Sequence, residues 1–393
     1  MPGAMRDAVI VGAVRSPIGK KNGALSRTHP TDLLGAVLRA LLDRTDVDPA
    51  AIDDVIGGCV TQTGAQGVNV TRNAWIAAGL PWDVPATTVD RQCGSAQQAA
   101  HFAAQGVIAG AYDLVIACGV EAMSQVGLGT NAIQPGFAFS DSWLEAVGGR
   151  EFLYTQFQAA QQIARDWDIS RQDMDELAVE SHRRAWQATQ EGRFSREIVP
   201  IKVTGEDGSV EELSVDECIR PQTTIEGLAA LPQIMEGCPD ITAGNSSPIS
   251  DGAAALLIAS PERAAQLGLT PRARFVDFAV AATEPIVMLK GPIPATRKLL
   301  DRSGMSLDDF DLLECNEAMG SVVPMWEKEF GIDHARVNVN GSGISLGHPV
   351  GCTGARIMVT LLHELERTGG RYGYQTMCEG GGQANATVIE RLG

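Results

Sequence analysis

The sequence contains no run of about 18 apolar residues, the length that a membrane-spanning helix requires. Its N-terminus lacks the basic and apolar pattern of a targeting segment, and residues 390–393 do not form a peroxisomal signal. We therefore expect a cytoplasmic protein without a membrane span.

The chain also lacks the cysteine spacings of a metal site or a disulfide framework. Its eight cysteines include no Cys-x-x-Cys pair, and none lies at zinc-ligand spacing from a histidine. With 393 residues, 44% of them hydrophobic, the chain can build a large core without disulfides. The sequence thus predicts reduced thiols, no metal and two or three domains.

Basic residues are scarce relative to acidic ones. Lys and Arg number 31 against 48 Asp and Glu, so the formal net charge is −17. This balance argues against a nucleic-acid binder, which needs a basic face. It still allows an anionic small molecule, because a few arginines and helix N-termini can hold one.

Glycine, by contrast, is abundant around a single histidine. The stretch Gly341 to Gly354 holds His348 followed by Pro349, and its glycines argue against a strand or helix interior. It separates an alternating apolar run, Arg336 to Val339, from a helical pattern in residues 355–366. The pattern predicts a strand, a ligand-approaching loop and a helix.

Cys93 lies at a second junction of this kind. A strand-like run, Thr87 to Asp90, precedes it, and a helix of small residues follows from Ala96. The partial positive charge of a helix N-terminus lowers a thiol pKa, so we expect a reactive thiolate. The alternative is a buried structural cysteine.

The final third of the chain repeats the order of segments in the first. The unit around Cys93 ends near Cys118, and the unit around His348 ends near Cys378. Such order favours duplicated α/β halves, while the glycine-rich and charged residues 121–240 favour an inserted subdomain. The duplication would bring the loops of Cys93, His348 and Cys378 to one crevice.

These residue types suit acyl transfer. Cys93 and His348 form a nucleophile and base pair, and Cys378 precedes Gly380 in a loop rich in amide donors, as an oxyanion hole requires. Asn316 follows the apolar run 312–315, and its alternative role is a helix cap. The set does not suit hydride transfer or metal-dependent hydrolysis.

Several motifs together resemble the thiolase family, in family order and over essentially the whole chain. They are Arg15-Ser16-Pro17-Ile18-Gly19, Cys93-Gly94-Ser95, Ala243-Gly244-Asn245, Asp251-Gly252-Ala253-Ala254, Asn316-Glu317-Ala318, Gly347-His348-Pro349-Val350-Gly351-Cys352-Thr353-Gly354 and Cys378-Glu379-Gly380-Gly381-Gly382. The resemblance implies duplicated βαβαβαββ halves in a layered α-β-α-β-α arrangement with an inserted loop subdomain. It implies an N-terminal half of residues 1–121 and 251–272, a loop subdomain of 122–250 and a C-terminal half of 273–393.

The resemblance also implies roles and partners. Cys93 would be acylated, His348 would activate it and bind an oxyanion with a water held by Asn316, and Cys378 would move the proton at the substrate α-carbon. The N–H groups of Cys93 and Gly380 would form a second oxyanion hole. Arg220 and Ser247 would contact coenzyme A, although a surface salt bridge is an alternative for Arg220. The implied partners are CoA and acyl-CoA substrates, with no tightly bound cofactor, in a homodimer or homotetramer.

The sequence departs from the family pattern at the expected acyl pocket. Met319 and Gly320 replace an aromatic after Asn316-Glu317-Ala318, and Tyr154 to Phe157 replace the usual His-Met or Pro-Met. These changes allow a bulkier acyl group, and residues 57–62 and 93–98 are similar to bacterial thiolases of lipid or steroid breakdown. Two alternatives stay open: a decarboxylating enzyme of the ketoacyl-synthase type and a non-catalytic subunit of a β-oxidation complex.

Overall fold

The computed structural model describes residues 6–133, 136–150, 155–205 and 207–393. The strands are β1 Val9–Arg15, β2 Gly19–Lys20, β3 Asp54–Gly58, β4 Ala86–Val89, β5 Leu114–Ala122, β6 Ile201–Thr204, β7 Val210–Leu213, β8 Ser250–Ala259, β9 Ala273–Ala282, β10 Leu312–Cys315, β11 Tyr372–Glu379 and β12 Gln383–Arg391. The helices are α1 Pro30–Thr45, α2 Val70–Ala77, α3 Ser95–Ala109, α4 Thr130–Ile133, α5 Asp141–Ala146, α6 Gln156–Asp166, α7 Arg171–Gln190, α8 Ile225–Ala229, α9 Pro261–Gln266, α10 Pro292–Ser303, α11 Val322–Phe330, α12 Gly343–Leu346 and α13 Thr353–Thr368.

The two halves of the chain build sheets of the same design. In the first, β3 is parallel to β4 and β5, while β8 is antiparallel to β5 and β1. In the second, β10 is parallel to β11, while β12 is antiparallel to β11 and β9. A short antiparallel pairing of β1 with β9 joins them at one end. The predicted duplication is confirmed, although each sheet is mixed and not wholly parallel.

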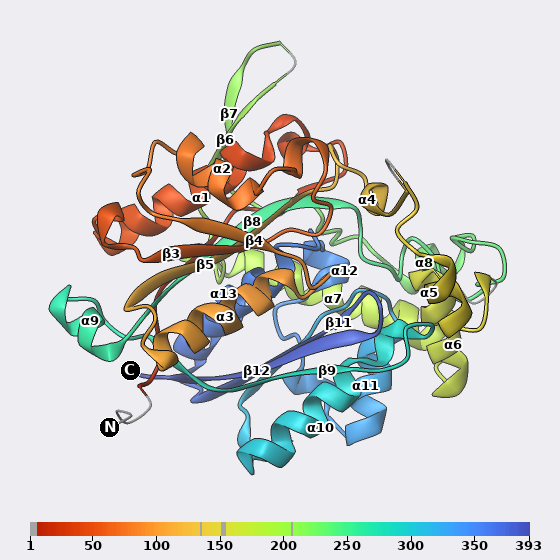
Figure 1. Cartoon of the computed structure of the whole chain (residues 1–393). Coiled ribbons are helices and arrows are strands. Elements are labelled where there is room, and N and C mark those ends of the chain that lie inside the picture. The colour runs from red at the N-terminus through yellow and green to blue at the C-terminus, as the bar shows by residue number, and fades with distance from the viewer. Residues whose placement is uncertain (1–5, 134–135, 151–154, 206) are drawn as a thin grey trace.

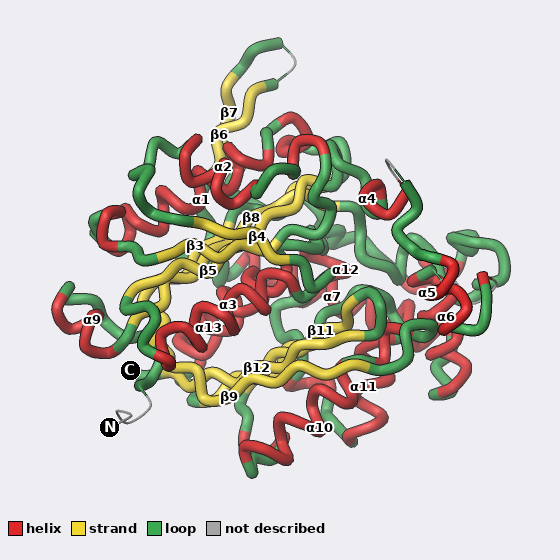
Figure 2. The backbone as a smooth tube through the Cα atoms, in the orientation of Figure 1, coloured by secondary structure: helices red, strands yellow, loops and turns green. Residues whose placement is uncertain are grey.

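Helices and sheets alternate in five layers (Figure 1). Helices α1 and α2 cover the first sheet, α3 and α13 lie between the two sheets, and α10 covers the second. Figure 2 shows the two bands of strands diverging around the central helices from the end where they meet. The expected α-β-α-β-α arrangement is therefore confirmed.

The central helices are largely buried, and polar side chains such as Gln97 of α3 and Arg356 of α13 are buried with them. Helix α3 packs through a series of small side chains that are fully buried, namely Ala96, Ala99, Ala100, Ala103 and Ala104. Helix α13 is buried continuously over its first thirteen residues. Gln97 donates to the Thr387 hydroxyl on β12, so α3 is covered by the second sheet as well as by the first.

One local expectation fails. Residues 336–339 do not form a strand, because residues 334–336 form a 3₁₀ turn and only Val337 bridges to Leu313. The polar segment that follows Lys202 contains a hairpin, β6 and β7, that projects from the body of the molecule. No helix among the described residues is long and apolar enough to span a membrane.

Candidate active site

His348 is held rigidly in its glycine-rich loop. The one-turn helix α12 ends at Gly347, whose φ of 101° lies in a region that side chains disfavour. The His348 ring is 4% exposed, with Nδ1 2.7 Å from the Thr353 hydroxyl and Nε2 3.3 Å from the Asn316 side-chain nitrogen. Its backbone N–H donates to the Ser250 hydroxyl.

The environment keeps this imidazole neutral. Burial lowers the pKa of His348 from 6.5 to about 3, and the positive charge of Arg356 on α13 lowers it further. A neutral imidazole has one unprotonated nitrogen, so His348 is available as a base.

Cys93 occupies the predicted junction of strand and helix. Gln92 before it has a φ of 48°, an unusual value for a residue other than glycine, and α3 begins two residues after it. The N–H groups of Gly380 and of Cys93 itself lie close enough to the Cys93 sulfur to lower the pKa of its thiol.

The expectation of a lowered pKa for Cys93 is wrong for this resting state. Burial raises the pKa of the thiol to about 12, the negative charge of Glu379 raises it further, and the two N–H groups offset only part of the increase. Desolvation outweighs the helix N-terminus because the thiol is only 4% exposed.

Cys378 lies beside Cys93 at the end of β11. Its thiol is fully buried, and burial together with a neighbouring Cys93 thiolate raises its pKa well above the ordinary value. Cys378 therefore rests as an uncharged thiol. The glycine turn to β12 follows, with positive φ at Gly381 and Gly382.

Glu379, next to Cys378, is a buried acid that the sequence interpretation missed. Neither of its carboxyl oxygens has a hydrogen-bond partner in the described part of the chain, and burial raises its pKa well above the ordinary value. A Cβ on Gly94 would lie 1.8 Å from one of these oxygens, so Glu379 packs directly beneath the Cys93 turn.

The two central helices bring the loops of Cys93 and His348 together. A Cβ on Gly354, in the first turn of α13, would lie 2.3 Å from the backbone nitrogen of Gln97 on α3. Gly119 within β5 likewise makes room for the carbonyl of Gly351. These contacts explain why the glycines are needed, since any side chain would separate the two loops.

A cavity of about 410 Å³ opens beside His348. Cys93 packs against Met123 and Val350, which both line the cavity. Arg220 and Ser247 line it too, as do Lys20 and Lys21, so the structure brings the predicted CoA contacts to the His348 side of the molecule. The rest of the lining is largely apolar, with Leu128, Gln156, Phe157, Ile234, Ala243, Ser246, Pro248, Ile249 and Met319.

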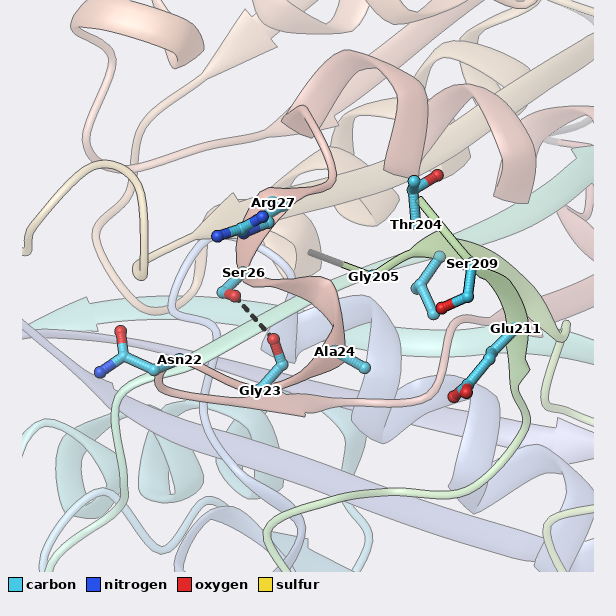
Figure 3. A pocket seen from close by; sticks show the side chains of 10 residues that line it. Asn22, Gly23, Ala24, Ser26, Arg27, Thr204, Gly205, Ser209 and Glu211 are labelled. Carbon is cyan, nitrogen blue, oxygen red and sulfur yellow. Dashed lines mark hydrogen bonds between the residues drawn. The ribbon is translucent and has the colours of Figure 1, made fainter. Parts of the chain in front are cut away.

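A second cavity, of about 360 Å³, lies between the loop after β2 and the β6–β7 hairpin (Figure 3). Its lining is mainly polar, and Ser26 in its wall donates a hydrogen bond to the Gly23 carbonyl. None of its lining residues is a cysteine or histidine, so it offers neither the thiol nor the imidazole that acyl transfer needs.

Two known protein families match the chain, one over its N-terminal part and one over its C-terminal part. The family described as "Thiolase, N-terminal domain" matches residues 8–262, and "Thiolase, C-terminal domain" matches residues 269–391. The chain belongs to the thiolase family. This thiolase is accordingly an enzyme of the acyltransferase class, and the two alternative readings are not favoured.

Similar proteins agree over the full length. The steroid 3-ketoacyl-CoA thiolase of Mycobacterium tuberculosis is 47% identical, covering 99% of this chain and 95% of its own. The 3-ketoacyl-CoA thiolase of Bacillus subtilis is 42% identical, covering 98% of this chain and 100% of its own. The crystal structure of the Bacillus anthracis acetyl-CoA acetyltransferase superposes with a TM-score of 0.91 at 40% identity, covering 99% of this chain and 100% of its own.

Sequence reasoning found the principal polar groups of the site but not their supports. It did not single out Thr353, Glu379, Lys20 or Lys21, because a hydroxyl or a charge has no distinctive spacing until the fold brings its partner close. Of the expected acyl-pocket segment, Gln156 and Phe157 line the cavity, and Tyr154 lies outside the described residues.

Proposed function

We propose that the enzyme acts by thiolysis, cleaving a 3-ketoacyl-CoA with CoA to acetyl-CoA and a shortened acyl-CoA. The observation that carries this proposal is that Cys93 and Cys378 are neighbours, and that Cys93 packs with Met123 and Val350, which line the same cavity as His348. The same groups run in reverse would condense two acyl-CoA molecules.

In the first half of the reaction, His348 Nε2 takes the Cys93 proton and the sulfur attacks the 3-keto carbon. The bond between the α- and β-carbons then breaks, so the acyl group stays on Cys93 and acetyl-CoA leaves as its enolate, which takes a proton from Cys378. In the second half, the thiol of CoA gives its proton to Cys378 and attacks the Cys93 thioester. The shortened acyl-CoA leaves, and Cys93 takes its proton back from His348. The raised pKa of Cys378 supports its role, because a proton donor must rest as a thiol.

The amide groups around Cys93 support an oxyanion hole. The N–H groups of Cys93 and Gly380 both act to lower the pKa of the Cys93 thiol, which supports their position beside the sulfur. A thioester oxygen formed on that sulfur would lie within their reach, and Asn316 beside His348 would hold a water for the other oxyanion. These groups supply nucleophile, acid and base, so we propose that no tightly bound cofactor takes part.

The charged rim of the cavity supports CoA binding. Arg220, Lys20 and Lys21 provide cations for phosphate groups, and Ser247 provides a hydroxyl. Three basic side chains at one cavity are notable on a chain whose formal charge is −17, and they support the binding of an anion there.

The acyl end of the cavity supports a substrate larger than acetoacetyl-CoA. Leu128, Phe157, Ile234 and Met319 give it apolar walls. The relative from Mycobacterium tuberculosis is named a steroid 3-ketoacyl-CoA thiolase, and we propose that this enzyme likewise accepts bulky acyl groups.

Thiolysis assays across a series of 3-ketoacyl-CoA esters, from acetoacetyl to steroid-sized, test this proposal. We expect kcat/KM to rise with acyl size beyond acetoacetyl. A maximum at acetoacetyl-CoA would contradict the preference for bulk, and rates near zero for every ester would contradict thiolysis itself.

We further propose a homodimer or homotetramer in the cytoplasm. Strand β4 ends its sheet, and near it Val68 is 91% and Trp82 80% exposed, which supports pairing with a second chain. All eight cysteines are free thiols, which supports a reducing compartment.

A further inference from the structure

We propose that Thr353 is a positioning residue that fixes the tautomer of His348, placing the proton on Nδ1 and leaving Nε2 free as the base. This inference rests on the thiolysis proposed above, because that reaction begins with proton transfer to Nε2. Nothing in the sequence pattern distinguishes Thr353 from the other residues of its motif.

The hydrogen bonds around the Thr353 hydroxyl lead to this assignment. The hydroxyl donates its single proton to the Pro349 carbonyl at 2.9 Å. It also lies 2.7 Å from His348 Nδ1, and while its own proton stays on the Pro349 carbonyl it accepts a hydrogen bond from Nδ1. On this assignment Nδ1 carries the imidazole proton.

The contact at the other ring nitrogen agrees. The Asn316 side-chain NH₂ lies 3.3 Å from His348 Nε2, and a donor at that position requires Nε2 to be unprotonated. Both contacts thus select the same tautomer. When Nε2 later takes the Cys93 proton, the Nδ1–H bond to Thr353 persists and the ring keeps its orientation.

Helix α13 makes Thr353 a rigid partner. Thr353 is its first residue, and the Pro349 carbonyl accepts the backbone N–H groups of Cys352 and Thr353 as well as the hydroxyl. The next residue, Gly354, packs against the backbone of α3. The hydroxyl therefore cannot shift without disturbing the junction that carries Cys93.

Three variants of the full-length enzyme test the proposal. Thr353→Val keeps the β-branched shape and removes the hydroxyl, and Thr353→Ser restores it. Thr360→Val is the matched control, because Thr360 is a buried threonine on the same helix whose hydroxyl donates to Glu197. We expect Thr353→Val to lower kcat about 10- to 100-fold at nearly unchanged KM, while Thr353→Ser and Thr360→Val stay within about 3-fold of wild type.

Nitrogen NMR of ¹⁵N-histidine-labelled enzyme reports the tautomer without substrate. With only six histidines, the His348 signals can be assigned by their loss in His348→Asn. We expect the Nδ1–H tautomer in wild type and Thr353→Ser, and a gain of Nε2–H in Thr353→Val.

An Nε2–H tautomer in the wild type would overturn the proposal. So would a loss of kcat in Thr353→Val without any change of tautomer, which would indicate a structural role alone. Because the NMR measurement needs no turnover, a failure of thiolysis itself would be recognised separately. The wild-type and Thr353→Ser spectra keep the test decisive even where Thr353→Val folds poorly.

Discussion

Cys93, Cys378 and His348 are all buried, and burial acts on each of them in the same direction, toward the uncharged form. The resting enzyme therefore holds two thiols and a neutral imidazole. We expect these groups to ionise only when substrate fills the cavity, because N–H donors can then stabilise the charge that develops.

Substitution of Cys93 and of Cys378, one at a time, should separate the roles of the two thiols. We expect Cys93→Ala to form no acyl-enzyme, because the nucleophile is gone. Cys378→Ala should still acylate from an acyl-CoA donor while carbon–carbon cleavage falls about 10²- to 10⁴-fold, since the proton donor is missing. Mass spectrometry of the intact protein and an enolate-dependent assay measure the two steps.

Cys118→Ala is the control for this pair, because Cys118 is also a fully buried free thiol but lies within β5. It should acylate like the wild type. Labelled acyl group recovered on any residue other than Cys93 would rule out the assigned roles.

His348 also makes the stability of the enzyme depend on pH. Its pKa is about 3 in the folded protein and near 6.5 when exposed, so between these values the unfolded chain binds the extra proton. The free energy of unfolding should therefore fall by about 1.4 kcal/mol per pH unit below 6.5 from this group. In His348→Asn the free energy of unfolding should change less steeply with pH, by the same amount per pH unit. Urea unfolding between pH 5 and 7 measures this slope. An identical slope in both proteins would contradict the lowered pKa.

At the scale of elements, the contact between α3 and α13 should tolerate no added side chain. In Gly354→Ala the new Cβ would meet the backbone nitrogen of Gln97 at 2.3 Å, and backbone cannot move aside as a flexible side chain can. We expect a loss of about 1–3 kcal/mol of stability and a lowered kcat, because the loops of Cys93 and His348 move apart. Thermal unfolding and the thiolysis assay measure both effects.

Gly227→Ala in α8 is the matched control, since its nearest neighbour would lie 3.4 Å away, at ordinary contact distance. It should leave stability within about 0.5 kcal/mol of wild type. Equal effects of the two substitutions would show that the junction is not the cause.

Among the elements, the sequence predicted the two central helices correctly and predicted a strand at residues 336–339 that does not form. The small-residue pattern after Cys93 predicted α3, and the apolar pattern of residues 355–366 predicted α13, because a buried helix carries its own periodicity. Residues 336–339 alternate like a strand and are not one, because their neighbours supply only a single bridge at Val337. Alternating apolar residues indicate which side of a segment is buried. A strand also needs a neighbouring strand whose backbone groups are free to pair with it.

For the site, the sequence allows the main residues to be located, but not their pKa values or the contacts that orient them. Cys93, His348, Cys378 and Asn316 could be located because their residue types have few uses at glycine-rich strand ends. The direction of the thiol pKa values could not be predicted, because it depends on how much water the fold removes from Cys93. The Thr353 contact depends on a side-chain orientation that no spacing reveals.

At the scale of the whole molecule, the free edge of β4 predicts association. Trp82→Glu combined with Val68→Glu places charge on the exposed apolar residues near that edge and should shift the enzyme toward a smaller species. Sedimentation velocity measures the change. Val210→Glu, at a 67% exposed position on the β6–β7 hairpin, is the control and should sediment like the wild type. An unchanged mass for both variants would place the interface elsewhere.

The central layer has a consequence for folding. Helix α3 belongs to the first half and α13 to the second, and each also contacts the other half, since Gln97 on α3 donates to Thr387 on β12 and α13 packs on β8. Neither half can therefore cover its own central helix. We expect the two repeats to fold and unfold as one cooperative unit, although each has a sheet of its own.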